Sequence, residues 1–189
     1  MTLLALSDAA TSLIQAKGPD ATIKEIAAAA GVSLRTVFRY VDGKEELAYI
    51  HPILWLEVFD AGINPTAEPA LPERLHAGGA AIAAHIDAEP DRPRAALWAA
   101  ASHPELARGF TSIFQKWVDR IAAEALQSIE ATGTHSTSDA HFRSRVIGAA
   151  TMGMVDACTR EWLFGGEGTL YTPIFERGFT VLAPILTGT

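Results

Sequence analysis

Basic and hydroxyl side chains gather between residues 22 and 44 in a pattern that suits contact with a nucleic acid. An arginine can donate two hydrogen bonds to one guanine, a threonine offers a base edge both a methyl group and a hydroxyl, and basic residues neutralise phosphates. This segment holds four basic and two acidic side chains, although the whole 189-residue chain has a net charge of −7. A small basic patch on an acidic chain favours docking through one face. The polar candidates for such contacts are Lys24, Arg35, Thr36, Arg39 and Lys44.

The same segment predicts two short helices that would position these side chains. Thr22 and Glu25 have the spacing of a capping box, Gly31 supplies a residue that tolerates a left-handed turn, and Ser33 can cap the next helix. Two short helices joined by a glycine-centred turn over residues 22–41 have the geometry of a helix-turn-helix, whose second helix enters the major groove. Its expected inward positions are Val37, Tyr40 and Val41.

Glycine and proline residues divide the remaining sequence into further helical patterns. One helix ends at Lys17-Gly18-Pro19, and another is expected to open at Asp42 and to be kinked or split by Pro52. A loop is predicted from Gly62 to Pro72. The later patterns lie at about 73–88, 93–101, 105–131, 139–164 and 172–186. The predicted fold is therefore all-α, with an N-terminal three-helix domain over residues 1–50 and a helical domain over residues 51–189.

Composition limits the class of protein. Hydrophobic residues make up 49% of the chain and charged residues 20%, so there is enough apolar surface to exclude wholesale disorder. A mean hydropathy of +0.16 indicates extra surface buried between subunits. Cys158 is the only cysteine, which excludes a disulfide framework and a cysteine-based metal site. Because the sequence has no convincing signal peptide and no run of about 20 apolar residues, we expect no membrane span and a cytoplasmic location.

Three blocks of sequence keep the order and spacing of a known regulatory domain. They are Thr22-Ile23-Lys24-Glu25-Ile26-Ala27, Gly31-Val32-Ser33-Leu34-Arg35-Thr36-Val37-Phe38-Arg39-Tyr40-Val41 and Lys44-Glu45-Glu46-Leu47. Over roughly the first 50 residues, the chain resembles the DNA-binding domain of TetR-family transcriptional regulators. The resemblance implies a homodimeric repressor with an N-terminal helix-turn-helix DNA-binding domain and a helical C-terminal domain for ligand binding and dimerisation. A small-molecule effector would release the double-stranded DNA operator, and no cofactor or metal is implied.

Carried over by position, the resemblance assigns the DNA contacts residue by residue. The residues that would face base edges are Leu34, Arg35, Thr36 and Phe38. Those that would face phosphates are Thr22, Arg39, Tyr40 and Lys44, and Lys24 and Ser33 complete the expected contact set. Tyr40 has an alternative role, because its ring can simply pack against the domain.

Three features depart from the family pattern. The family usually has tyrosine where this chain has Phe38, so one polar contact from that ring is missing. A small residue is common where Arg35 stands, which changes the base that could be read. Many members also have a basic arm before the first helix, whereas here only Met1 to Ser7 precede it, so either the grip on DNA is weaker or the native start lies upstream.

The helical pattern at 139–164 is apolar on two sides, and a helix of this kind must be covered both by its own core and by a partner. One side holds Phe142, Val146, Ala149 and Gly153, and the other holds Ile147, Thr151, Met154 and Cys158. The last helix adds Ile174, Phe175, Phe179, Leu182, Ile185 and Leu186. These last two helices can form a four-helix dimer interface, which the resemblance also implies. Two-fold symmetry would place two recognition helices about one DNA turn apart on a pseudo-palindrome.

Bulky residues on the middle helices are the candidates for a largely apolar effector site with a few polar anchors. The aromatic and methionine candidates are Trp98, Phe110, Phe114, Trp117, Met152 and Trp162, and the polar ones are His85, His103 and Asp156. The alternative is that the apolar residues are ordinary core, which an aromatic stripe at helical spacing more often indicates. Asp156 and Arg160 have the i, i+4 spacing of an ion pair, which is the alternative role of Asp156.

The sequence offers little support for catalysis, so we expect no enzyme activity. The six histidines include no i, i+4 pair with zinc-binding spacing, and the glycines at 165–168 lack the lysine of a phosphate-binding loop. Two other classes stay open. One is an activator or co-regulator that binds a protein partner, and the other is a helical small-molecule carrier or enzyme that has kept the domain but lost DNA binding.

Overall fold

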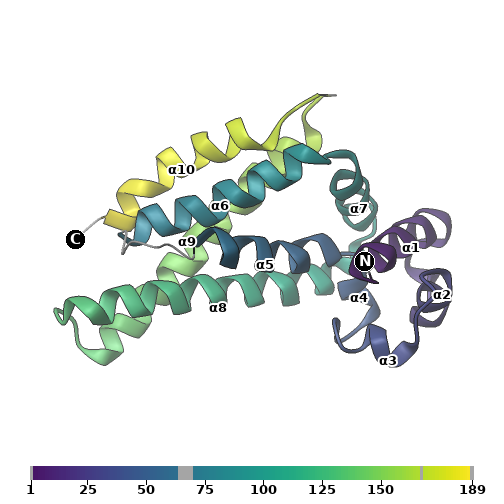
Figure 1. Cartoon of the computed structure of the whole chain (residues 1–189), viewed down its shortest axis with the longest axis horizontal. Coiled ribbons are helices and arrows are strands. Elements are labelled where there is room, and N and C mark those ends of the chain that lie inside the picture. The colour runs from purple at the N-terminus through teal and green to yellow at the C-terminus, as the bar shows by residue number, and fades with distance from the viewer. Residues whose placement is uncertain (1, 64–69, 167, 188–189) are drawn as a thin grey trace. The chain divides into compact units, whose positions relative to one another are not determined.

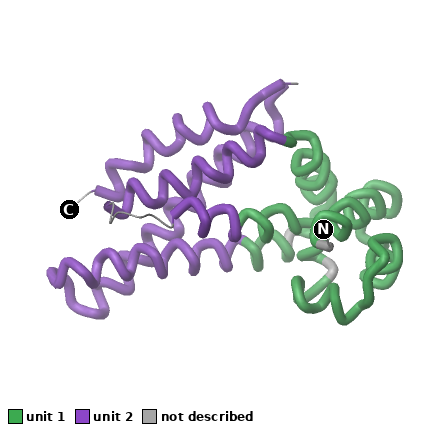
Figure 2. The backbone as a smooth tube through the Cα atoms, viewed as in Figure 1, with its two compact units in different colours: residues 1–55, 89–113 green, residues 56–88, 114–189 purple. Residues whose placement is uncertain are grey.

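The computed structural model describes residues 2–63, 70–166 and 168–187, with the side chains of Thr2, Lys44 and Ala107 excepted. The described residues form helices and connecting turns without a strand, which confirms the all-α prediction (Figure 1). They pack into two compact units (Figure 2). Unit 1 comprises residues 1–55 and 89–113, and unit 2 comprises residues 56–88 and 114–189. Among the described residues, no helix combines the length and the hydropathy needed to cross a bilayer.

Unit 1 begins with the helices predicted for the helix-turn-helix. It contains α1 (Thr2–Lys17), the short 3₁₀ helix η1 (Gly18–Asp20), α2 (Ile23–Ala29), α3 (Leu34–Val37) and α4 (Lys44–Leu47). The capping box of α2 is present, because the Thr22 hydroxyl accepts the Glu25 N–H and the Glu25 carboxylate accepts the Thr22 N–H. Gly31 has a φ of 68°, the left-handed conformation that the turn between α2 and α3 requires. Local sequence therefore sets the start of both helices.

The connection after α3 differs from the prediction at Asp42. The cap residue of α4 is Gly43, with no side-chain hydrogen bond, and the Asp42 N–H donates instead to the Glu46 carboxylate at 3.0 Å. Glu46 is buried, and its other carboxylate oxygen accepts a hydrogen bond from the Ser112 hydroxyl. The buried Glu46 carboxylate thus stabilises the turn over residues 42–46 by accepting hydrogen bonds from Asp42 and Ser112. The predicted split at Pro52 is confirmed, since α4 ends at Leu47 and Pro52 lies in the first turn of α5 (Ile50–Ile63).

Unit 1 also contains a segment from the middle of the chain. This segment includes α7 (Asp91–Ala101), the 3₁₀ helix η2 (Pro104–Leu106) and the start of α8 (Ala107–Thr132). Arg92 of α7 pairs with Asp8 of α1 at 3.1 Å, and Gly109 of α8 packs against the backbone of Glu45 in α4. The sequence had placed every residue after 50 in one helical domain. The structure instead packs residues 89–113 with the N-terminal helices.

Unit 2 is built from long helices. It contains α6 (Leu71–Ala88), α9 (Thr137–Phe164), α10 (Tyr171–Thr187) and the later parts of α5 and α8, all within about three residues of the predicted helical patterns. The predicted loop at 62–72 largely covers residues 64–69, which lie outside the described residues. Asp87 accepts the backbone N–H groups of Tyr171 and Thr172 at 2.6 and 3.0 Å, so its carboxylate satisfies the first turn of α10.

Candidate nucleic-acid interface

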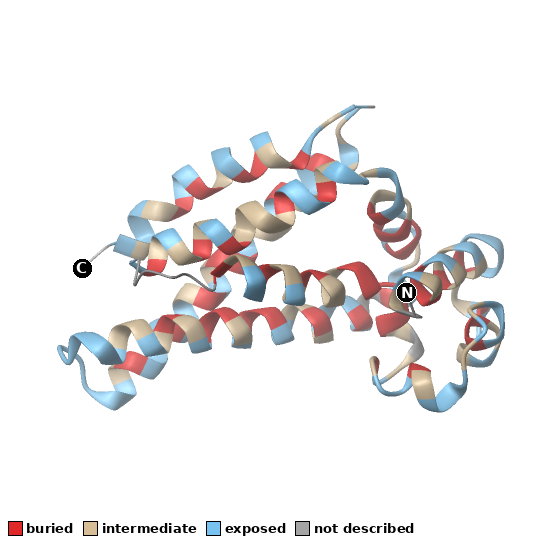
Figure 3. Ribbon diagram, in the orientation of Figure 1, coloured by how far each residue is buried: buried red, intermediate tan, exposed pale blue. Residues whose placement is uncertain are grey.

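The short helix α3 is held by its own first turn and by one buried residue. The Ser33 hydroxyl accepts the Thr36 N–H at 3.1 Å and lies 2.9 Å from the Thr36 hydroxyl. Val37, with none of its surface exposed, attaches α3 to the core of unit 1. The turn and helix from α2 to α3 are otherwise largely exposed (Figure 3). A capped helix anchored on one face presents its opposite face in a fixed orientation, which is what groove recognition requires.

The opposite face of α3 carries two exposed apolar side chains and an arginine. Leu34 is 43% exposed and Phe38 is 54% exposed. Arg35 lies between them in sequence and makes no hydrogen bond or ion pair with any residue that the structure describes. Thr36 is half-buried and its hydroxyl is engaged with Ser33, so it is less available to a base than the sequence suggests.

The residues expected at phosphates occupy different environments. The Arg39 guanidinium donates to the Tyr40 hydroxyl at 2.5 Å and lies 4.7 Å from the centre of its ring, so the half-buried Tyr40 orients an exposed cation. Lys24 is exposed on α2. Lys44 begins α4, but its side chain lies outside the described residues. The contact roles of all ten residues stay predictions.

The Thr22 hydroxyl is engaged in the cap of α2, where it also donates to the Glu25 carboxylate at 2.8 Å. The Lys17 ammonium donates to the same carboxylate at 2.6 Å. These donors favour the charged form and lower the pKa of Glu25 to about 2, with the Lys17 hydrogen bond as the largest cause and those from Thr22 next. The cap thus joins the end of α1 to the start of α2 electrostatically.

This pairing predicts an acid-dependent loss of stability. The pKa of Glu25 is lower in the folded chain than its ordinary value of 4.5. The contribution of Glu25 to the free energy of unfolding is therefore complete above pH 4.5 and is lost as the pH falls from about 4.5 towards 2. We expect the NMR titration of the Glu25 carboxyl to have its midpoint near 2, and Lys17→Ala to raise that midpoint. A Glu25 midpoint above 4 would contradict the arrangement.

The nine residues proposed for an effector site belong to both units and differ in burial. Trp117 packs against Phe59 with ring centres 5.5 Å apart, and Trp162 packs against Tyr171 at 5.8 Å. The exposed members are His85, Trp98 and Phe110, the half-buried ones are His103, Phe114 and Asp156, and Met152 is buried like the two packed tryptophans. Asp156 pairs with the exposed Arg160 at 2.8 Å, the alternative that the spacing indicates. None of the nine lines either of the two cavities described next.

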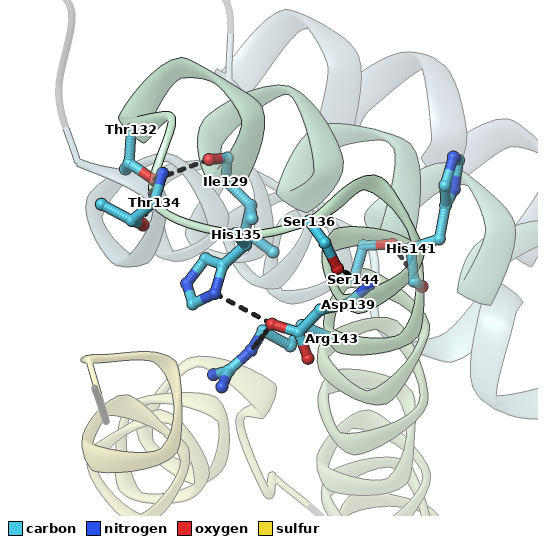
Figure 4. Close-up of polar contacts among 9 residues, drawn as sticks. All are labelled: Ile129, Thr132, Thr134, His135, Ser136, Asp139, His141, Arg143 and Ser144. Carbon is cyan, nitrogen blue, oxygen red and sulfur yellow. Dashed lines mark hydrogen bonds and ion pairs between the residues drawn. The ribbon is translucent and has the colours of Figure 1, made fainter.

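Unit 2 has an open cavity of about 900 Å³ and a smaller one of about 340 Å³. The larger has apolar walls from α6, α9 and α10, including Leu71, Ile147 and Leu186, and a polar rim at the α8–α9 turn. On this rim Asp139 lies between His135 and Arg143, at 2.9 and 2.7 Å (Figure 4). The Arg143 hydrogen bond, more than His135, lowers the pKa of Asp139. Sequence analysis missed this cluster, although the i, i+4, i+8 spacing was readable, with Asp139 and Arg143 in α9 and His135 just before its N-cap.

Helices α9 and α10 leave an apolar surface exposed on unit 2, as the two-sided pattern predicts. Phe142, Val146, Val181 and Ile185 are 69%, 46%, 73% and 56% exposed. The prediction for α10 was wrong in detail, because four of its six interface candidates are buried within the chain where α10 packs on α6 and α9. Those four are Ile174, Phe175, Phe179 and Leu182. We call the four exposed residues the outer apolar face; three of them, Phe142, Val146 and Ile185, also line the larger cavity.

Comparisons with known proteins agree with this arrangement. Residues 6–48 match the model of the bacterial regulatory proteins of the tetR family. No curated protein sequence matches the chain. The fold is similar to that of the fatty acid degradation regulator FadR from Bacillus halodurans, with 18% identity, 98% of each chain covered and a TM-score of 0.58.

Two further solved structures have the same fold. FadR from Bacillus subtilis in complex with stearoyl-CoA is 15% identical, with 98% of each chain covered and a TM-score of 0.59. SmeT in its triclosan complex is 15% identical over 97% of this chain and 90% of that one, with a TM-score of 0.56. Residues 6–48 are therefore similar to the bacterial regulatory proteins of the tetR family, and the chain as a whole has the fold seen in the FadR and SmeT structures.

Proposed function

We propose that this chain is a ligand-relieved transcriptional repressor that binds a pseudo-palindromic DNA operator as a homodimer. The observation that carries the proposal is the exposed face of α3, where Leu34, Arg35 and Phe38 project from a helix fixed by the Ser33 cap and the buried Val37. A fixed helix with an unengaged arginine suits reading of base edges in the major groove.

The outer apolar face supports the homodimer. A second copy of the chain is the occupant that this surface fits, because α9 and α10 present apolar residues there and a two-fold axis brings identical patches together. Large exposed apolar side chains such as Phe142 and Val181 lose contact with water in such a dimer. Two copies of α3 then meet two half-sites, which is why the operator should be a pseudo-palindrome.

The effector should be small and largely apolar. Stearoyl-CoA and triclosan, which occupy two regulators of the same fold, both carry large apolar parts. The cavity of about 900 Å³ in unit 2 has the size and the mixture of apolar wall and polar rim usual for such ligands. An effector would relieve repression only by its higher affinity for the conformation that does not bind DNA.

Selection of tight binders from random DNA duplexes tests the proposal. We expect enrichment of a palindromic site, and a reporter carrying that site should be transcribed less when the chain is present. Arg35→Ala should weaken binding of the selected site by about tenfold to a hundredfold, because a bidentate contact to a base is lost. Arg39→Ala should reduce the slope of log affinity against log salt by about 1, because one phosphate contact is lost.

Arg145→Ala is the matched control, since Arg145 is an exposed arginine of α9 and belongs to unit 2 rather than to the helix-turn-helix. It should leave both the affinity and the salt slope unchanged. Failure to enrich any site at low salt would contradict DNA recognition. Higher transcription on operator occupancy would contradict the repressor and indicate an activator.

A further inference from the structure

The face that α3 presents is mostly apolar, which is unusual for a surface that meets DNA. Leu34 and Phe38 lie four residues apart and therefore on the same side of α3, with 43% and 54% of their surfaces exposed. The neighbouring polar groups are already engaged, since Thr36 bonds with Ser33 and Arg39 with Tyr40. Only Arg35 adds an unengaged hydrogen-bonding group to this face of the described chain.

The major groove offers one apolar group to such a face. Of the four bases, only thymine carries a methyl group there, whereas the others present nitrogen and oxygen atoms that need hydrogen-bond partners. A leucine or phenylalanine pressed against those polar atoms would remove water from them without replacing its hydrogen bonds. Contact with a methyl group instead removes apolar surface from water on both sides.

We infer that Leu34 and Phe38 read thymine methyl groups, so that each operator half-site presents thymines to α3 beside the base that Arg35 contacts. This inference rests on the proposed function and deepens it, because it names the chemical feature of the DNA that sets specificity. Phe38 then acts as a specificity residue through its ring, with no need for a ring hydroxyl.

Replacement of thymine by uracil tests the inference directly, because uracil lacks the methyl group and keeps the base pair. Each thymine of the selected operator is replaced in turn, on synthetic duplexes that contain no methylated cytosine. We expect at least one position in each half-site at which uracil weakens binding by about fourfold, the effect of one buried carbon group. Thymines outside the half-sites are the internal control.

Variants of the chain show which side chain does the reading. In Leu34→Ala or Phe38→Ala, uracil at the position read by the missing side chain should weaken binding by less than about 1.5-fold, because the two changes remove the same contact. Leu170→Ala removes a leucine that is 50% exposed in unit 2 and should keep the full uracil effect. Thermal unfolding of each variant confirms that it is folded.

Different outcomes separate this inference from the function on which it rests. If a palindromic site is enriched but uracil is tolerated at every position, the inference that Leu34 and Phe38 read thymine methyl groups is wrong. The proposed repressor function is unaffected by that result. If the uracil effect persists in both alanine variants, other residues read the methyl groups and the assignment is wrong. If no site is enriched, both the function and the inference are overturned.

Discussion

Replacement of Gly109 by alanine is expected to lower the free energy of unfolding by about 3 kcal/mol, near the upper end of the usual cost of overpacking. A Cβ atom at this position would lie 2.1 Å from the carbonyl oxygen of Glu45 and 2.4 Å from its carbonyl carbon. Both atoms belong to the backbone of α4, so no side-chain rotation relieves the clash. The start of α8 would have to withdraw from α4, the helix that follows α3 in the chain.

Thermal unfolding measures this effect, and the melting temperature should fall by roughly 6–12 °C for a chain of this size. Gly166→Ala is the control, because Gly166 is exposed, has no left-handed φ and has no atom within 4 Å of an added Cβ. Its stability should stay within about 0.5 kcal/mol of the wild type. If the Gly109→Ala variant has the same melting temperature as the wild type, α8 and α4 are not in close contact in solution.

The double variant Phe142→Asp, Val181→Asp is expected to be a folded monomer with operator affinity lowered by at least about a hundredfold. Both side chains are largely exposed, so a single chain loses little when they change. In a two-fold interface each substitution occurs twice, and four carboxylates would be buried without partners. A monomer binds one half-site only and loses the large gain in affinity that linked binding provides.

Sedimentation measures the oligomeric state, and titration of the selected operator measures the affinity. Ala84→Asp is the matched control, because Ala84 is exposed on α6 and lies outside the outer apolar face. It should remain dimeric and bind the operator normally. A dimeric double variant would refute the proposed interface, whereas a monomeric wild type would refute the homodimer itself.

The helix-turn-helix was predictable because its determinants are local. The Thr22–Glu25 and Ser33–Thr36 contacts span three residues each, and Gly31 sets its own turn, so sequence spacing is sufficient to find them. The start of α4 was not predictable in the same way. The Asp42 N–H donates to the Glu46 carboxylate, which also accepts a hydrogen bond from Ser112. Because Ser112 is 66 residues away from Glu46, local sequence spacing cannot reveal this contact.

The burial of the nine effector candidates could not be predicted for a related reason. Helical spacing identifies an apolar stripe but does not say which neighbour covers it, so exposed Trp98 and buried Trp117 look alike in sequence. The last helix shows the same ambiguity, since Phe179 faces the chain's own core and Val181 faces outwards. Nothing in the sequence around Gly109 signals that another backbone passes beside it.

The discontinuous make-up of unit 1 has a consequence for the design of chimaeras of this chain. Its residues come from two stretches of the chain, and the second stretch contacts the first through the Arg92–Asp8 pair and through Gly109 at α4. A chimaera joined at residue 50 would separate these stretches and pair each with a foreign surface. A chimaera that keeps unit 1 intact therefore needs three junctions, after residue 55, before residue 89 and after residue 113, so that residues 1–55 and 89–113 are transferred together.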